Sequence, residues 1–150
     1  MKEDYNILKT IAKGTIEVDR IDIEIRKLTG FLIRKLTIFS VDKGFDEKIS
    51  ELSSLLLRLE ELKERLVRNI ENIDKVREDI VDKLKEKHQV QFVELDVRST
   101  KCIGKIDNLL NVIEDSLEVF KETKNITKEQ KDEITKIEKK LKDIKEKWFK

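Results

Sequence analysis

The sequence predicts an all-α protein, in the form of an elongated antiparallel bundle of three or four helices with coiled-coil-like heptad packing. Charged residues make up 43% of the 150-residue chain, against roughly 25% in ordinary soluble domains, and there are four glycines and no proline. Apolar residues recur at alternating steps of three and four over long stretches, which is the repeat of packed helices. Because 150 residues is a usual length for one domain, we expect a single helical-bundle domain over residues 1–150.

The first helix is expected over about residues 5–40. Its apolar seam steps by fours and threes through Ile7, Ile11, Gly14, Val18, Ile21, Ile25, Leu28 and Leu32. A strand over residues 16–25 is the competing interpretation, because β-branched and polar residues alternate there. The pattern ends near Gly44, which suits a helix C-cap or a turn, and Asp46 is then a candidate cap for the next helix.

The second helix, over about residues 46–87, has the clearest repeat. Its seam runs through Phe45, Ile49, Leu52, Leu56, Leu59, Lys63, Leu66, Ile70, Ile73, Arg77, Ile80 and Leu84. Leu55 and Leu62 widen this seam into a broad stripe, as in a helix that packs against two neighbours. Lys63 and Arg77 are charged seam residues, which either select a partner or extend their charged ends into solvent.

The third helix is expected over about residues 91–122, after a break near residues 87–91. The phase of the seam slips there, and the segment that follows is poor in strong helix formers. A strand over residues 90–97 is the alternative to its first turns. A continuous helix through residues 84–92 is also open, since neither glycine nor proline forces a turn.

The fourth helix is expected over about residues 127–149. Thr127 and Gln130 have the spacing of a capping box, in which each residue satisfies a backbone N–H of the other. From residue 127 onward the chain carries nine lysines against six acidic residues, and it ends in Trp148, Phe149 and Lys150. A basic amphipathic helix with this aromatic pair could lie on a membrane or on a partner, although ordinary packing in the bundle also accounts for its apolar seam.

Another candidate interaction surface is the stretch of residues 31–39, which is apolar around most of a helical circumference. Its apolar residues include Phe31, Leu32, Ile38 and Phe39. We expect them to be buried, either inside the bundle or in an interface between chains.

Acidic residues line one side of the second helix, where Glu71, Asp74, Glu78 and Asp82 step by three and four. Such stripes could hold cations, but helical di-iron sites need inward Glu-x-x-His pairs, and the only histidine, His88, does not follow a glutamate at that spacing. We interpret the stripe as a solvated face with intrahelical ion pairs. The sequence therefore predicts no metal site and no cofactor.

Enzymatic activity is not expected. Cys102 and His88 are accompanied by no nucleophile motif or glycine-rich oxyanion loop, and no phosphate-binding or dinucleotide-binding motif occurs. Cys102, Ser99 and Ser116 are small seam residues that favour close packing of helices.

Net charge and cysteine content limit the partners and the cellular compartment that we expect. The net charge is only +1, so nucleic-acid binding is not favoured. A single cysteine, together with the absence of a signal-like start and of a long apolar run, favours a cytoplasmic location. We therefore expect a non-enzymatic helical protein–protein interaction or scaffold module, self-associating as a homo-oligomer, with peripheral membrane-surface binding through the last helix as the alternative.

Overall fold

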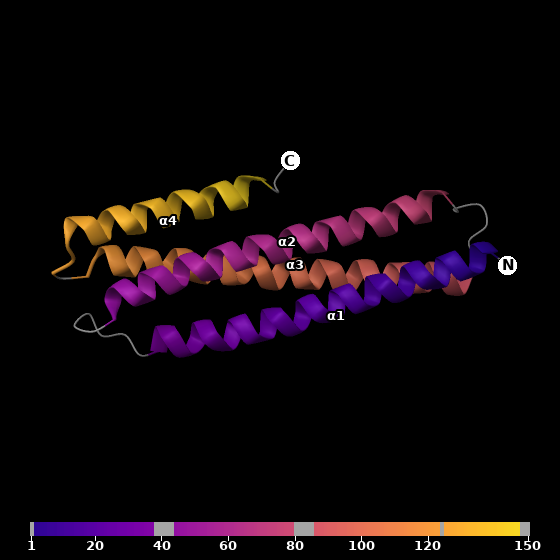
Figure 1. Cartoon of the computed structure of the whole chain (residues 1–150), viewed down its shortest axis with the longest axis horizontal. Helices are drawn as coiled ribbons and strands as arrows, with labels where there is room; N and C mark the ends of the chain where they lie inside the picture. Colours follow the sequence, from indigo (N-terminus) through magenta and orange to yellow (C-terminus); the bar gives the residue numbers. More distant parts are fainter. Residues whose placement is uncertain (1, 38–43, 80–85, 124, 148–150) are drawn as a thin grey trace. The chain divides into compact units, whose positions relative to one another are not determined.

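The computed structural model describes residues 2–37, 44–79, 86–123 and 125–147, and they form a bundle of four helices (Figure 1). These helices are α1 (Lys2–Thr37), α2 (Phe45–Asp79), α3 (Glu86–Lys121) and α4 (Lys128–Lys147). The all-α prediction is confirmed. The predicted helix ends near residues 40 and 149 lie outside the described residues, and the predicted end near 122 agrees with Lys121. The predicted end of the second helix near residue 87 is wrong, because residues 86 and 87 belong to α3.

Both strand alternatives are wrong, because residues 16–25 lie inside α1 and residues 90–97 lie inside α3. The side chains explain the outcome for α1: Val18, Ile21 and Ile25 are buried at helical spacing, whereas Ile16 and Ile23 are about half exposed. Burial of one helical face outweighs the modest strand preference of β-branched residues.

The chain forms two compact units. Unit 1 comprises residues 1–26 and 62–106, and unit 2 comprises residues 27–61 and 107–150. Each of α1, α2 and α3 contributes one stretch to each unit, whereas α4 belongs to unit 2 alone. Unit 1 therefore contains three helical segments, and unit 2 contains four.

Within unit 1, α2 runs antiparallel to α1 and to α3. Asn69 donates a hydrogen bond to the carbonyl of Gly14 at 3.2 Å, and four residues earlier on α2, Arg65 pairs with Glu17. Gly14 lies against α2: a Cβ at this position would lie 2.8 Å from Cδ1 of Ile73. Close packing of this part of α1 thus depends on a residue without a side chain.

The break predicted near residues 87–91 is wrong, because α3 begins at Glu86 and contains these residues. Helices α2 and α3 do not continue one another as a single straight helix. Arg77 Nη1 lies 3.0 Å from Asp96 Oδ2, although residues 19 apart in one straight helix would be about 28 Å apart. The first turns of α3 are poor in helix formers, but His88, Phe92 and Leu95 on them are buried, and such packing stabilises a helix more than propensity does.

Within unit 2, α2 packs against α3 through the rings of Phe45 and Phe120, whose centroids lie 5.6 Å apart. The capping box of α4 is confirmed, since the backbone N–H of Gln130 donates to Thr127 Oγ1 at 3.1 Å and that of Thr127 donates to Gln130 Oε1 at 3.0 Å. These two bonds fix the first turn of α4.

The start of α2 differs in detail from the expectation. Gly44 has φ of 77°, a left-handed conformation that favours glycine, and its carbonyl accepts a hydrogen bond from the N–H of Lys48. Asp46 lies inside the first turn rather than at the cap, and its Oδ1 accepts a hydrogen bond from Gln130 Nε2 at 3.0 Å. Asp46 is therefore a contact to α4.

Candidate functional site

In unit 2, helix α4 packs against both α2 and α3. Its buried side chains are Ile134, Ile137, Leu141 and Ile144, none more than 5% exposed. On α3 of the same unit, Leu110 and Leu117 have no exposed surface. The apolar side of α4 is thus removed from water within unit 2.

Ion pairs fix the edges of α4 in unit 2. Lys140 Nζ lies 3.4 Å from Glu60 Oε1 of α2, and Lys145 Nζ lies 2.6 Å from Glu114 Oε2 of α3. Lys121 of α3 pairs with Glu138 of α4 at 2.7 Å. The lysines near the end of α4 therefore reach carboxylates on both neighbouring helices.

The side of α2 that meets α4 is defined by a seven-residue spacing. Asp46 and Glu60 contact Gln130 and Lys140, and Ser53, midway between them, lies with Ile137 in the lining of one cavity of unit 2. Residues seven apart lie on nearly the same side of a helix. In unit 1 the same series continues on α2 with Val67 and Asp74.

The corresponding side of α3 follows from the same spacing. The equivalent residues in unit 1 lie fourteen positions earlier on α3. Asp96 corresponds to Leu110, Val97 to Asn111 and Ile103 to Leu117. Leu110 and Leu117 are completely buried, whereas Asp96 and Ile103 are partly exposed. Asn111 contacts Lys145 but is exposed, as is Val97, which is 48% exposed. The loss of burial in unit 1 therefore concerns Asp96 and Ile103.

We call these residues of unit 1 the α2–α3 face. It consists of Val67, Ile70 and Asp74 on α2 and of Asp96, Val97 and Ile103 on α3. The ion pair between Arg77 and Asp96 joins the two helices at one end of the face. Ile70 of α2 and Ile103 of α3 are both partly exposed, so each helix contributes an apolar residue to the face.

The charge on the α2–α3 face is mainly acidic. Burial raises the pKa of Asp74, and the carboxylates of Asp96 and Glu78 raise it further, while the Arg77 guanidinium opposes them. Glu71, on the outer side of α2, is exposed. The acidic stripe seen in the sequence therefore borders an apolar surface.

Lys63 and Arg77, the two charged seam residues, have different environments. Lys63 is 4% exposed, so its side chain does not extend into solvent. Arg77 is partly exposed and pairs with Asp96. Arg77 is thus the candidate residue that the structure brings to the α2–α3 face.

The remaining candidate interaction residues lie elsewhere. Leu55 and Leu62 are buried, the first in unit 2 and the second in unit 1, and Leu32 is buried in unit 2. Phe31 is partly exposed. Ile38, Phe39, Trp148 and Phe149 are outside the described residues.

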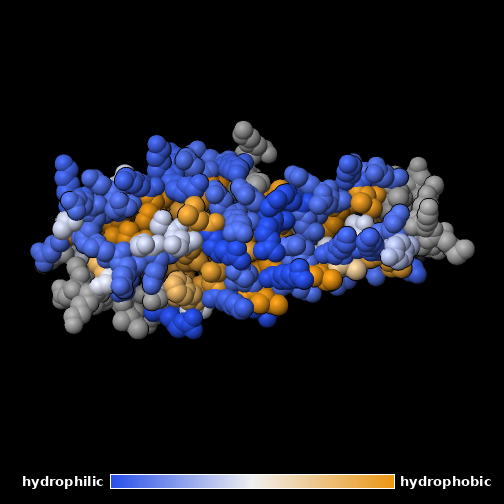
Figure 2. Space-filling model, viewed as in Figure 1, coloured by the Kyte–Doolittle hydropathy of each residue, from blue (hydrophilic) through white to orange (hydrophobic). Residues whose placement is uncertain are grey.

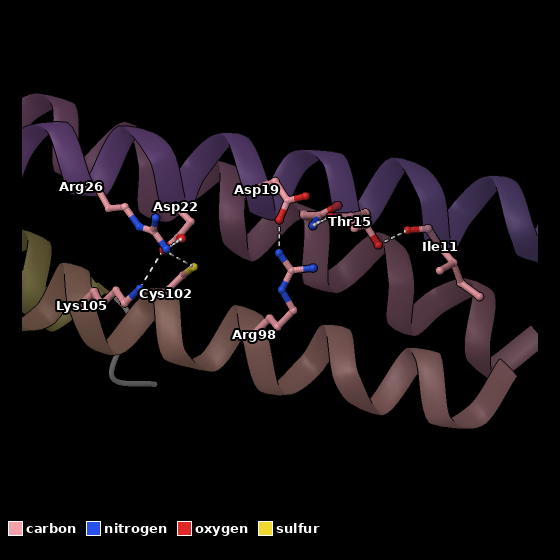
Figure 3. A network of polar contacts seen from close by, with 10 residues as sticks. Ile11, Thr15, Asp19, Asp22, Arg26, Arg98, Cys102 and Lys105 are labelled. Atoms are coloured by element: carbon pink, nitrogen blue, oxygen red, sulfur yellow. Dashed lines mark hydrogen bonds and ion pairs between the residues drawn. The ribbon is translucent and has the colours of Figure 1, made fainter. Parts of the chain in front are cut away.

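A polar cluster joins α1 and α3 in unit 1 (Figure 3). Asp22 accepts a hydrogen bond from Lys105 Nζ at 2.8 Å, pairs with Arg26 at 3.1 Å and lies 3.9 Å from Cys102 Sγ. The hydrogen bond from Lys105 lowers the pKa of Asp22. Burial and the Asp22 charge raise the pKa of the Cys102 thiol, which keeps it protonated and weakly nucleophilic.

Cys102 and His88 do not form a dyad. Both lie on α3, fourteen residues apart in sequence, which corresponds to about 21 Å along a helix. His88 Nδ1 and Ser99 Oγ are buried without a hydrogen-bond partner. The two groups are core positions of α3 with unsatisfied polar atoms.

Three further observations concern ligands and membranes. A cavity of about 630 Å³ in unit 2 is lined by carboxylates, hydroxyls, an amide and two isoleucine side chains, and its described lining contains no histidine, cysteine or lysine. Within the described ranges, no three or more His, Cys, Asp or Glu residues are grouped as they would be around a metal ion. None of the described helices combines the length and apolar character needed to cross a membrane.

Comparison with known proteins gives no family assignment. No protein-family model, no curated protein and no solved structure matches this chain. The α2–α3 face was missed in the sequence because its apolar residues do not stand out from the seam. The seven-residue series from Asp46 to Asp74 gives no local signal of the face either, because it is polar or acidic at every position except Val67.

Proposed function

We propose that this chain is a non-enzymatic helical protein–protein interaction or scaffold module that docks a partner helix on the α2–α3 face of unit 1. One observation carries the proposal. In unit 2, where α4 packs on the α2–α3 pair, Leu110 and Leu117 of α3 are completely buried, whereas the equivalent Asp96 and Ile103 of unit 1 are partly exposed and α4 contributes nothing. Apolar side chains reach the surface in patches bordered by hydrophilic residues (Figure 2). Docked amphipathic helices cover surfaces of this kind.

The expected affinity is modest. Fully burying a valine or isoleucine side chain contributes about 1.5–3 kcal/mol, and these side chains are already partly buried. The loss of translational and rotational freedom on association opposes that gain. We therefore expect a dissociation constant in the range of about 1–100 µM rather than a permanent complex.

Self-association remains a prediction, and it needs a surface other than the wide stripe of α2. Leu55 and Leu62 are buried inside their own units, so contacts through them would require a unit to open. Two α2–α3 faces would also bring Asp74 against acidic residues of the second copy, which is unfavourable. We therefore place the docking of a different helix first.

Peripheral membrane binding is the second candidate. The apolar side chains of α4, including Ile134 and Leu141, are buried in unit 2, so α4 would have to detach before it could lie on a lipid surface. Flotation of the full chain with vesicles of phosphatidylserine and phosphatidylcholine tests this candidate. Association of the full chain with these vesicles would overturn our preference for protein docking.

The main test uses three labelled helical peptides with the sequence of residues 127–147. They differ only at positions 140 and 145, which carry lysine as in the chain, glutamine or glutamate. We expect at least one peptide to bind the full chain saturably in fluorescence anisotropy. Binding should be lost on Val97→Glu, which places a charge on the α2–α3 face.

The matched control is Leu57→Glu in unit 2, since Leu57 is 52% exposed and so resembles Val97. It should leave binding unchanged. Circular dichroism of both variants checks that they keep their helices. If no peptide binds, or if binding survives Val97→Glu, the α2–α3 face is not a docking site.

A further inference from the structure

Resting on this proposed function, we infer that the partner helix for the α2–α3 face is a lysine-rich amphipathic helix of another protein, similar in chemistry to α4. The inference concerns the class of partner at the same face. It is carried by the charges that surround the face and by the way α4 satisfies the equivalent charges in unit 2.

Three carboxylates of α2 lie on or beside the face. Arg77 is engaged by Asp96 at 3.0 Å, while Glu71, Asp74 and Glu78 follow one another at steps of three and four, with Lys75 as a basic neighbour on the same helix. Burial is the main cause of the raised pKa of Asp74, and the carboxylates of Asp96 and Glu78 raise it further while Arg77 lowers it. An approaching helix with lysines at its edges would lower the repulsion among these groups.

Unit 2 shows the arrangement that such a helix would adopt. The apolar side chains of α4 follow the spacing three, four and three from Ile134 to Ile144, and Lys140 and Lys145 flank them. One lysine reaches Glu60 of α2 and the other reaches Glu114 of α3. A partner with this pattern would cover the apolar residues of the face and bring lysines to the acidic residues on both helices.

The orientation of the partner also follows. In unit 2, Lys121 pairs with Glu138 while Glu114, earlier on α3, pairs with Lys145, later on α4. Helix α4 is therefore antiparallel to α3. Because up-down packing alternates direction between neighbours, we expect the partner helix to run antiparallel to α3 in unit 1 as well.

The three peptides described above test the inference by their order of affinity. The lysine peptide should bind at least tenfold more tightly than the glutamate peptide, with the glutamine peptide between them. A control peptide with Lys136→Glu and Lys142→Glu has the same net charge as the glutamate peptide. Lys136 and Lys142 have side chains about three-quarters exposed in the chain, so this control should keep most of the affinity of the lysine peptide.

Charge reversal on the protein provides the complementary test. Glu71→Lys should weaken binding of the lysine peptide several-fold and strengthen binding of the glutamate peptide. Glu94→Lys makes the same change at an exposed residue of α3 away from the face and should alter neither. This exchange of preference cannot result from a loss of folding.

The outcomes separate the two claims. If the glutamine or glutamate peptide binds as tightly as the lysine peptide while Val97→Glu still abolishes binding, helix docking stands and the lysine-rich partner is wrong. Equal weakening by Glu71→Lys and Glu94→Lys would also overturn the charge inference. If no peptide binds, both claims fail.

Discussion

Asp22 of α1 and Lys105 of α3 are joined in unit 1 by a charge-assisted hydrogen bond of 2.8 Å between Asp22 Oδ1 and Lys105 Nζ. The side chain of Asp22 is 22% exposed, and Arg26 lies on its other oxygen at 3.1 Å. Such partly shielded pairs contribute more than pairs in open solvent. Asp22 is thus a specific link between two helices that are far apart in the sequence.

Because of the contact between Asp22 and Lys105, we expect the free energy of unfolding to depend on pH. The pKa of folded Asp22 lies below its ordinary value of 3.8, so the stabilising contribution is present above that value and is lost as pH falls through the folded-state pKa. We expect Asp22→Asn to lower the free energy of unfolding by about 0.5–1 kcal/mol at pH 7. The difference should shrink as the pH falls below 3.8, where Asp22 of the unfolded chain binds a proton before Asp22 of the folded chain does.

Urea denaturation at pH 7 and pH 3 measures the effect. Asp115→Asn, at an exposed residue of α3 in unit 2, serves as the control and should change stability little at either pH. A difference between wild type and Asp22→Asn that stays constant over this range would contradict the role of the carboxylate charge.

The capping box of α4 predicts a loss of helix stability on Thr127→Ala. The variant removes the hydroxyl that accepts the N–H of Gln130 and should cost about 1 kcal/mol. Thr135→Ala is the control, because Thr135 lies inside α4 and its hydroxyl bonds only to the carbonyl of Lys131. Thermal unfolding followed by circular dichroism should show a lower midpoint for Thr127→Ala and no decrease for Thr135→Ala.

The success at Thr127 and the failure at residues 87–91 show what could be predicted from the sequence. A capping box involves residues three apart, so local spacing determines it. The start of α3 depends on the burial of Phe92 and Leu95 against distant segments, which outweighs a weak helix propensity. Fold class and the second helix were predictable because their pattern extends over many turns.

The α2–α3 face could not be predicted, because the side of a helix that meets α4 is decided by tertiary packing. On α3 the seam was expected to include Ser116, but Leu117 is the completely buried residue. In unit 2 the apolar stripe of α3 is wide enough to meet α4 as well as α2, and Leu117 lies four residues after Ile113. No local pattern shows that α4 reaches only one of the two units.

Gly14 of α1 and Gly104 of α3 predict different effects of substitution by alanine. A Cβ at Gly104 would meet no atom within 4 Å, so Gly104→Ala should stabilise the chain by about 0.5–1 kcal/mol through helix propensity. At Gly14 the added Cβ would lie 2.8 Å from Ile73 Cδ1 and 3.5 Å from Leu95 Cδ1, so Ile73 must move. That displacement offsets the gain.

Chemical denaturation of the two alanine variants checks the comparison. We expect Gly14→Ala to be less stable than Gly104→Ala by about 1–2 kcal/mol. Equal stabilisation by both substitutions would mean that α1 and α2 are not packed closely at Gly14.

We predict that removal of the Ser99 hydroxyl group makes the folded chain more stable. Its Oγ is buried without a hydrogen-bond partner, and the residue is 1% exposed. An unsatisfied buried polar group costs about 1–3 kcal/mol, while the loss of one oxygen leaves a very small cavity. We therefore expect Ser99→Ala to raise the free energy of unfolding by about 1 kcal/mol.

Ser116→Ala is the control, because Ser116 Oγ already donates a hydrogen bond to the carbonyl of Val112 at 2.8 Å. The effect of Ser116→Ala on stability should stay close to that of helix propensity alone. A lower thermal midpoint for Ser99→Ala than for wild type would show that the hydroxyl is satisfied in solution.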